Sequence, residues 1–144
     1  MAEQARRTWR HPYLWSVVSG VIYALGFAGF DLWPLAFLGL IPLAAVLQQA
    51  QSGKRAWCLG WTMGFTAYAL ATYWNLDMLQ VFSGMPGAVN VLLATLLWAF
   101  QGLSFAAFAL LWFWLGVRSV WMGAAAFIVT EALCAEIAAA RARG

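Results

Sequence analysis

The chain has 144 residues, of which 65% are hydrophobic, 17% aromatic and 9% charged. A soluble domain of this size exposes much of its area and carries about a quarter charged residues, so the composition excludes that class. It also excludes a disordered chain, because disordered chains are rich in charge and poor in aromatic residues. With a mean hydropathy of +0.78, the sequence predicts an integral membrane protein.

Long uncharged stretches place the expected membrane spans. A helix needs about 20 residues to cross a hydrocarbon core of about 30 Å, and the first three such stretches predict one span each. A fourth stretch is interrupted at Ser83–Gly87, where glycine and proline favour a turn. Between a basic tail at 1–12 and a short tail at 139–144, we expect spans near 13–30, 33–50, 57–76, 88–117 and 120–138.

Helices are expected rather than the strands of a closed barrel. Backbone polar groups in a membrane must pair internally, which both architectures achieve. Barrel strands alternate polar and apolar side chains, and runs such as Phe105–Leu111 do not alternate. The predicted fold is therefore an all-α integral membrane bundle of about five transmembrane helices.

Basic residues predict the orientation of this bundle. Arg6, Arg7 and Arg10 precede the first span, Lys54 and Arg55 lie in the second loop, and Arg118 lies in the fourth. The alternate loops, around Asp31 and from Asp77 to Gly87, carry none. This is a positive-inside pattern with a cytoplasmic N-terminus, and it explains the basic isoelectric point without a nucleic-acid partner. Arg141 and Arg143 break the pattern, so either the last segment does not cross or the tail is not a natural end.

Few side chains are suited to catalysis or metal binding. His11 is the only histidine, which excludes a multi-histidine metal site. Cys58 lies near the cytoplasmic face and Cys134 lies three residues after Glu131, on one helix face with it. A Cys134 nucleophile beside a Glu131 base is less favoured than a small thiol packed among alanines. We therefore expect no catalytic residue, no metal and no cofactor in this chain.

The acidic residues and one glycine pair have structural interpretations. Asp31 is placed to cap the next helix, and Asp77 lies at the outer end of the third span. Glu131 is an ionisable group inside a span, so structural pairing and function remain equally open. Gly60 and Gly64 form a GxxxG spacing that permits close helix approach, although such spacing is common in a glycine-rich chain.

Two motifs carry a family resemblance. Phe30-Asp31-Leu32-Trp33-Pro34 lies at the first hairpin, and Ser83-Gly84-Met85-Pro86-Gly87 follows a helix whose end is marked by Trp74. Together with the Thr130-Glu131 pair, they resemble the N-terminal membrane region of apolipoprotein N-acyltransferases. Gly29 and Ser83 depart mildly from the family pattern, and the residues after Leu133 depart from it more.

The resemblance implies a location and a reaction. The family acts at the bacterial inner membrane as a multi-pass protein. A cysteine takes an acyl chain from a phospholipid and passes it to the α-amine of a lipoprotein. That chemistry belongs to a nitrilase-like domain with a Glu-Lys-Cys triad, which is absent from these residues. The only lysine, Lys54, is expected on the cytoplasmic side, so the triad cannot be assembled here.

We therefore expect the membrane domain of an apolipoprotein N-acyltransferase-like protein, truncated or split, with no activity alone. It would anchor the enzyme and shape a lipid-access cleft, with membrane phospholipid and a separate nitrilase-like chain as partners, and lipoprotein as substrate only in a complete enzyme. The alternatives are a non-catalytic subunit that binds lipid or a partner, and a non-functional remnant. The expected lipid entrance residues are Gly84, Met85, Pro86, Gly87 and Trp74, against the simpler interpretation of a tight turn.

Overall fold

In a computed structural model of the chain, the described residues are 11–26, 32, 34–116 and 140–141, and they form helices without any strand. The helices are α2 (Pro12–Leu25), α3 (Pro34–Leu47), α4 (Gly53–Ala71), α5 (Asn75–Ser83) and α6 (Gly87–Trp114). The prediction of an all-α fold is confirmed for this part of the chain.

Proline and serine set the starts of these helices. Pro12 and Pro34 occupy first helical positions, where the missing proline N–H costs nothing. The hydroxyl of Ser52 caps α4 by accepting a hydrogen bond of 3.3 Å from the backbone N–H of Arg55. Pro86 precedes α6 in an extended conformation, which fixes the point at which this helix begins.

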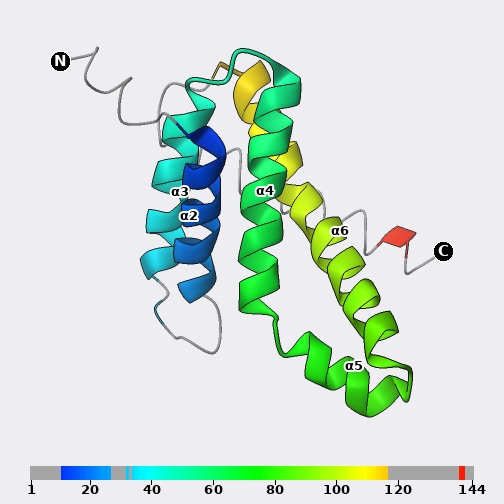
Figure 1. Cartoon of the computed structure of the whole chain (residues 1–144). Coiled ribbons are helices and arrows are strands. Elements are labelled where there is room, and N and C mark those ends of the chain that lie inside the picture. The colour runs from blue at the N-terminus through cyan, green and yellow to red at the C-terminus, as the bar shows by residue number, and fades with distance from the viewer. Residues whose placement is uncertain (1–10, 27–31, 33, 117–139, 142–144) are drawn as a thin grey trace.

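Helix α4 lies at the centre of the bundle (Figure 1). It packs against α2 on one side and α6 on the other, while α3 packs mainly on α2. The chain runs up and down, so α2 and α4 start at the end of the bundle where α3 and α6 finish. Lys54 and Arg55 lie at this end, and Asp77 lies near the opposite end. Lys54 and Arg55 are therefore separated from Asp77 along the bundle.

The core forms where these helices meet. Phe105 of α6 is fully buried, and its ring meets that of Tyr23 of α2 edge-on, with 5.1 Å between the centroids. The other large buried side chains of this core are Leu43, Val46, Leu47, Leu59, Met63, Phe108 and Trp112. The core thus links all four long helices, with α4 contributing its middle layer.

The predicted spans and the observed helices differ in extent. The first, second and fourth predicted spans correspond to α2, α3 and α6, and each of these helices is shorter than the span predicted for it. The third, expected over 57–76, ends at Ala71 as α4, because Thr72 takes a non-helical backbone conformation. A separate helix, α5, follows where we expected the rest of the span and a loop. The segment 120–138, with Glu131 and Cys134, lies outside the described residues, as does Asp31.

The described helices differ in whether their length and composition would let them cross a membrane. Among the described helices, α6 is long and apolar enough to cross a membrane, with a mean hydropathy of 1.8 over its best window. Its 28 residues extend about 42 Å. Helices α2 and α3 are apolar but shorter. In α4, the hydroxyls of Thr62 and Thr66 donate to the carbonyl oxygens of Cys58 and Thr62, so these polar groups are satisfied within the helix.

Candidate functional site

The turn between α5 and α6 contains four of the expected entrance residues. Helix α5 ends at Gly84, whose φ of +60° lies in the left-handed region that favours glycine. Met85 and Pro86 follow, and both are exposed, Met85 by half of its surface. A Cβ at Gly84 or at Gly87 would meet no atom within 4 Å, so the outer side of the turn is open. The predicted break at Ser83–Gly87 is confirmed.

Asn90 holds this turn in place. Its side chain is fully buried. The Ser83 hydroxyl donates to the Asn90 Oδ1 atom at 2.8 Å, and the Asn90 Nδ2 atom donates to the Met85 carbonyl oxygen at 3.3 Å. The backbone N–H of Met85 donates to the Ser83 hydroxyl at 3.2 Å. Ser83, Met85 and Asn90 therefore form a closed hydrogen-bonded clamp.

Sequence reasoning gave Asn90 no role. One feature of the sequence could have indicated it. Asn90 is the only asparagine in the fourth uncharged stretch, and it lies seven residues after Ser83, which borders the glycine-proline turn. An amide in an apolar helix needs partners when it is buried. That rule could have indicated a clamp, but not which groups the amide would bind.

Trp74 lies at the other end of α5, immediately before its first residue. Trp74 is half exposed. The whole length of α5, about 14 Å, separates it from Gly84. The structure therefore groups Gly84, Met85, Pro86 and Gly87 in one turn and places Trp74 at the same end of the bundle, one helix away. Glu131 lies outside the described residues.

Two indole groups connect α4 to α6 on the approach to this end. The Nε1 atom of Trp98 donates to the Thr72 hydroxyl at 3.0 Å, and that hydroxyl donates to the Tyr68 carbonyl oxygen at 2.7 Å. The Nε1 atom of Trp61 donates to the Ala99 carbonyl oxygen at 3.1 Å. The Trp98 bond attaches the residue that follows α4 to α6, close to where α5 starts, and the Trp61 bond joins the two helices nearer their middle.

The glycines of α4 bring its backbone against α6. A Cβ built on Gly64 would lie 2.9 Å from the Cα and carbonyl oxygen of Gly102, and one on Gly60 would overlap the Phe105 carbonyl oxygen. The close helix approach expected of Gly60 and Gly64 is confirmed. Its partner surface on α6, centred on Gly102, was not predicted from the sequence.

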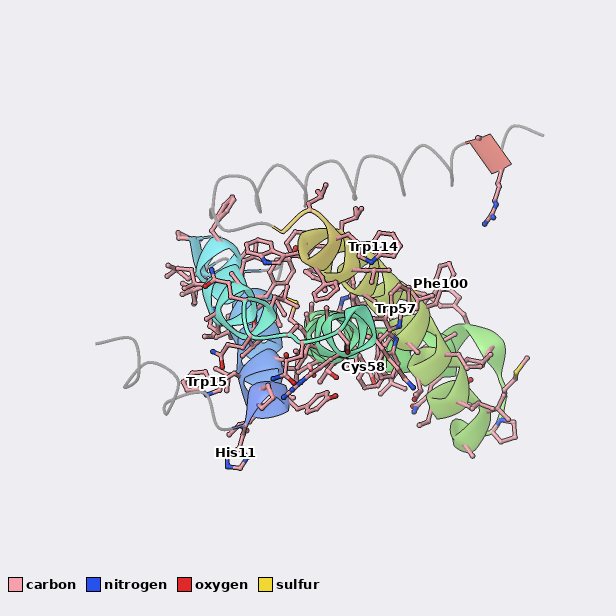
Figure 2. All side chains as sticks on the ribbon, turned by 90° about the horizontal axis from the view of Figure 1, so that it is seen from above. His11, Trp15, Trp57, Cys58, Phe100 and Trp114 are labelled. Atoms are coloured by element: carbon pink, nitrogen blue, oxygen red, sulfur yellow. The ribbon has the colours of Figure 1, made fainter. Side chains whose placement is uncertain are left out.

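The titratable residues are widely distributed along the bundle. Lys54 and Arg55 are exposed at the start of α4, and Cys58 is half-buried one turn further on. Figure 2 shows His11 at the start of α2, pointing away from the helices. In the part of the chain that the structure describes, no three His, Cys, Asp or Glu residues lie close enough to hold a metal ion.

Comparison with known proteins decides the family. Residues 19–138 match the apolipoprotein N-acyltransferase N-terminal domain. The chain belongs to this family. It is 38% identical over 78 residues to the apolipoprotein N-acyltransferase of Vibrio cholerae, covering 54% of this chain and 15% of that protein. It is 32% identical over 126 residues to that of Pseudomonas putida, covering 84% of this chain and 23% of that protein.

A third apolipoprotein N-acyltransferase, from Azotobacter vinelandii, is 36% identical over 105 residues, covering 73% of this chain and 19% of that protein. The chain thus spans about a fifth of the length of these relatives. The apolipoprotein N-acyltransferase N-terminal domain match includes α3, α4, α5 and α6 entirely, and α2 from Ser19 onward. It therefore includes both the clamp at Asn90 and the glycine contact between α4 and α6.

Proposed function

We propose that this chain forms the membrane domain of an apolipoprotein N-acyltransferase-like protein and that its bundle anchors and positions a lipid-access cleft. The observation that carries the proposal is the family match over 19–138, combined with an α6 that is long, apolar and exposed along one flank. In water, so large an exposed apolar surface would drive aggregation. A bilayer removes that cost, because lipid is the solvent for these side chains.

The charges support a multi-pass orientation in the bacterial inner membrane. Lys54 and Arg55 would face the cytoplasm, which puts the turn at Gly84–Gly87 on the outer face. A phospholipid donor and a lipoprotein acceptor would meet on that face. Met85 is exposed there on a turn that the Asn90 clamp holds rigid, so we place it at the entrance.

The acyl-transfer chemistry would come from groups outside the described helices. Lys54 and Cys58 lie near each other at the start of α4, but the described residues include no glutamate, so these helices do not bring together the Glu, Lys and Cys that the proposed reaction uses. A nitrilase-like catalytic unit would supply them, on the same polypeptide or on a separate one. This domain would contribute position and access rather than bond making.

A chimera tests the proposal. The matching N-terminal segment of the Pseudomonas putida enzyme is replaced by this chain, and triacylated lipoprotein is measured in cells depleted of their own enzyme. We expect the chimera to restore triacylation and to resist extraction from membranes by alkaline carbonate. A chimera that is produced in the membrane at normal level and leaves lipoprotein diacylated would contradict the acyltransferase function and favour a non-catalytic subunit or a remnant.

The entrance is tested in the same chimera. Met85→Ala should lower triacylation several-fold at unchanged protein level, because it removes the exposed side chain at the turn. Leu92→Ala, at an exposed position of α6, is the matched control and should have little effect. Equal triacylation by the Met85 variant and the parent chimera would exclude the entrance role while leaving the membrane-domain proposal intact.

A further inference from the structure

Helix α5 has three distinct faces, although it contains only nine residues. At 3.6 residues per turn, Asn75, Leu76, Leu79 and Ser83 share the face that packs toward α6, and they are buried or half-buried. Asp77 and Gln80 form a narrow exposed polar edge. The third face consists of Trp74, Met78, Val81 and Phe82, and we name these four residues the outer apolar face of α5.

The outer apolar face is too exposed and too apolar for water. Phe82 is 83% exposed and Val81 77% exposed. On the neighbouring helix α6, Val89, Leu92 and Leu93 are also exposed. Contiguous apolar surface of this kind marks contact with a membrane or with another protein.

The polar edge of α5 favours a membrane over a protein as the partner of the outer apolar face. Asp77 and Gln80 lie beside the apolar face on the same short helix, and both are exposed. A protein covering the whole outer surface would have to desolvate the Asp77 carboxylate, which is costly without a paired charge. The boundary of a bilayer offers hydrocarbon and water within a few ångströms, so it satisfies both faces together.

The direction and the aromatic residues of α5 fit that boundary. Figure 1 shows α5 running across the ends of α4 and α6 rather than along them. A helix that lies in the plane of a membrane surface buries its apolar side and leaves its polar side in water. Tyr73 and Trp74, both exposed at its start, are residue types that gather at the membrane–water boundary.

We propose that α5 is an interfacial helix that lies in the headgroup layer of the leaflet opposite Lys54 and Arg55, with its outer apolar face in the acyl chains. This inference rests on the proposed membrane location of the bundle. Such a helix would set the depth at which α4 and α6 sit. It would also hold the turn at Met85 at the level of the lipid headgroups. Because no lysine or arginine lies between residues 56 and 117, its attachment would depend on apolar contact rather than on anionic lipid.

Spin labels test this arrangement. The full chain, with Cys58→Ala and Cys134→Ala, receives single cysteines at 77, 78, 80, 81 or 82 and is reconstituted into vesicles of phosphatidylethanolamine and phosphatidylglycerol. Each nitroxide is then probed with oxygen, which concentrates in lipid, and with a water-soluble nickel chelate. We expect the oxygen-to-nickel accessibility ratio to be several-fold higher at 78, 81 and 82 than at 77 and 80.

A label at Leu96, which is exposed on α6, serves as the reference for membrane location. If Leu96 is in lipid but 78, 81 and 82 are as accessible to nickel as 77 and 80, the interfacial helix is excluded and the membrane bundle stands. If 78, 81 and 82 are immobile and shielded from both probes, protein covers the face and the inference is overturned. If Leu96 is itself open to nickel, the membrane proposal fails, and the inference fails with it.

Discussion

At the scale of single residues, two glycines three positions apart have different reasons to be glycine. Gly84 has a φ of +60°, which a side chain disfavours regardless of the space around it. Gly87 is the first residue of α6 and has an ordinary helical conformation with open surroundings. The turn therefore requires glycine for its backbone only at Gly84.

This difference gives a paired prediction. Gly84→Ala should lower the free energy of unfolding by about 1–2 kcal/mol, the usual cost of the left-handed conformation. Gly87→Ala is the control and should leave it unchanged or slightly higher, because alanine favours the helix. Thermal unfolding in detergent, followed by tryptophan fluorescence, measures both. Equal losses in the two variants would mean that the left-handed conformation at Gly84 is not retained in solution.

The clamp at Asn90 gives a second residue-scale prediction. Asn90→Leu should lower the free energy of unfolding by about 1–3 kcal/mol, because Ser83 and the Met85 carbonyl oxygen lose their partner. Ser83→Ala should cost less, and the double variant Ser83→Ala with Asn90→Leu should cost less than the sum of the two. Thr95→Val, whose hydroxyl bonds only within α6, is the control. Strict additivity would contradict a shared hydrogen-bonded network.

At the scale of helices, packing of α4 on α6 depends on backbone contact. Gly64 faces the backbone of Gly102, which cannot move aside as a flexible side chain can. Gly53, at the start of the same helix, faces side chains only: the end of Leu110 lies 3.1 Å from the position of a Cβ, and the Phe113 ring lies at an ordinary contact distance of 3.6 Å. The two glycines therefore differ in what an added side chain would displace.

Gly64→Val should therefore separate the two helices and cost about 1–3 kcal/mol of stability or more. Gly53→Ala should cost little, since Leu110 can change rotamer. Unfolding midpoints in detergent test the difference. Fluorescence from Trp61 and Trp98, which bond across the same interface, should shift with Gly64→Val alone. An unchanged midpoint for Gly64→Val would show that α4 and α6 do not meet at this point.

Four of the five described helices could be predicted from the sequence, and one could not. Long uncharged runs predicted α2, α3, α4 and α6 because hydrophobicity and length are properties of a segment alone. Helix α5 was missed because its nine residues divide into three faces, which produces no simple period. The turn between α5 and α6 was predicted from Gly84, Pro86 and Gly87, whereas Asn90 was missed because its partners become neighbours only after α5 folds back on α6.

For the whole molecule, the separation of charge predicts how the bundle inserts. Lys54 and Arg55 lie at the end where α4 begins, and no lysine or arginine follows before Arg118. Basic residues in short loops are retained on the cytoplasmic side, whereas acidic residues have little influence. Orientation should therefore respond to the positions of lysine and arginine rather than to net charge.

A reporter fused after Ala88, just beyond the turn, tests this dependence on lysine and arginine. Alkaline phosphatase fused there should be active, and green fluorescent protein should be dark, because the turn is expected outside the cytoplasm. A four-residue variant carries Lys54→Gln, Arg55→Gln, Met85→Lys and Gly87→Lys, which moves the basic residues from the start of α4 to the turn. Fluorescence should then rise several-fold above background while phosphatase activity falls. The arginines before residue 11 still favour the original orientation, so the reversal should be incomplete. Asp77→Asn alters net charge on the same side as the turn and should leave both signals unchanged. If Asp77→Asn shifts the signals and the four-residue variant does not, lysine and arginine positions do not orient this bundle.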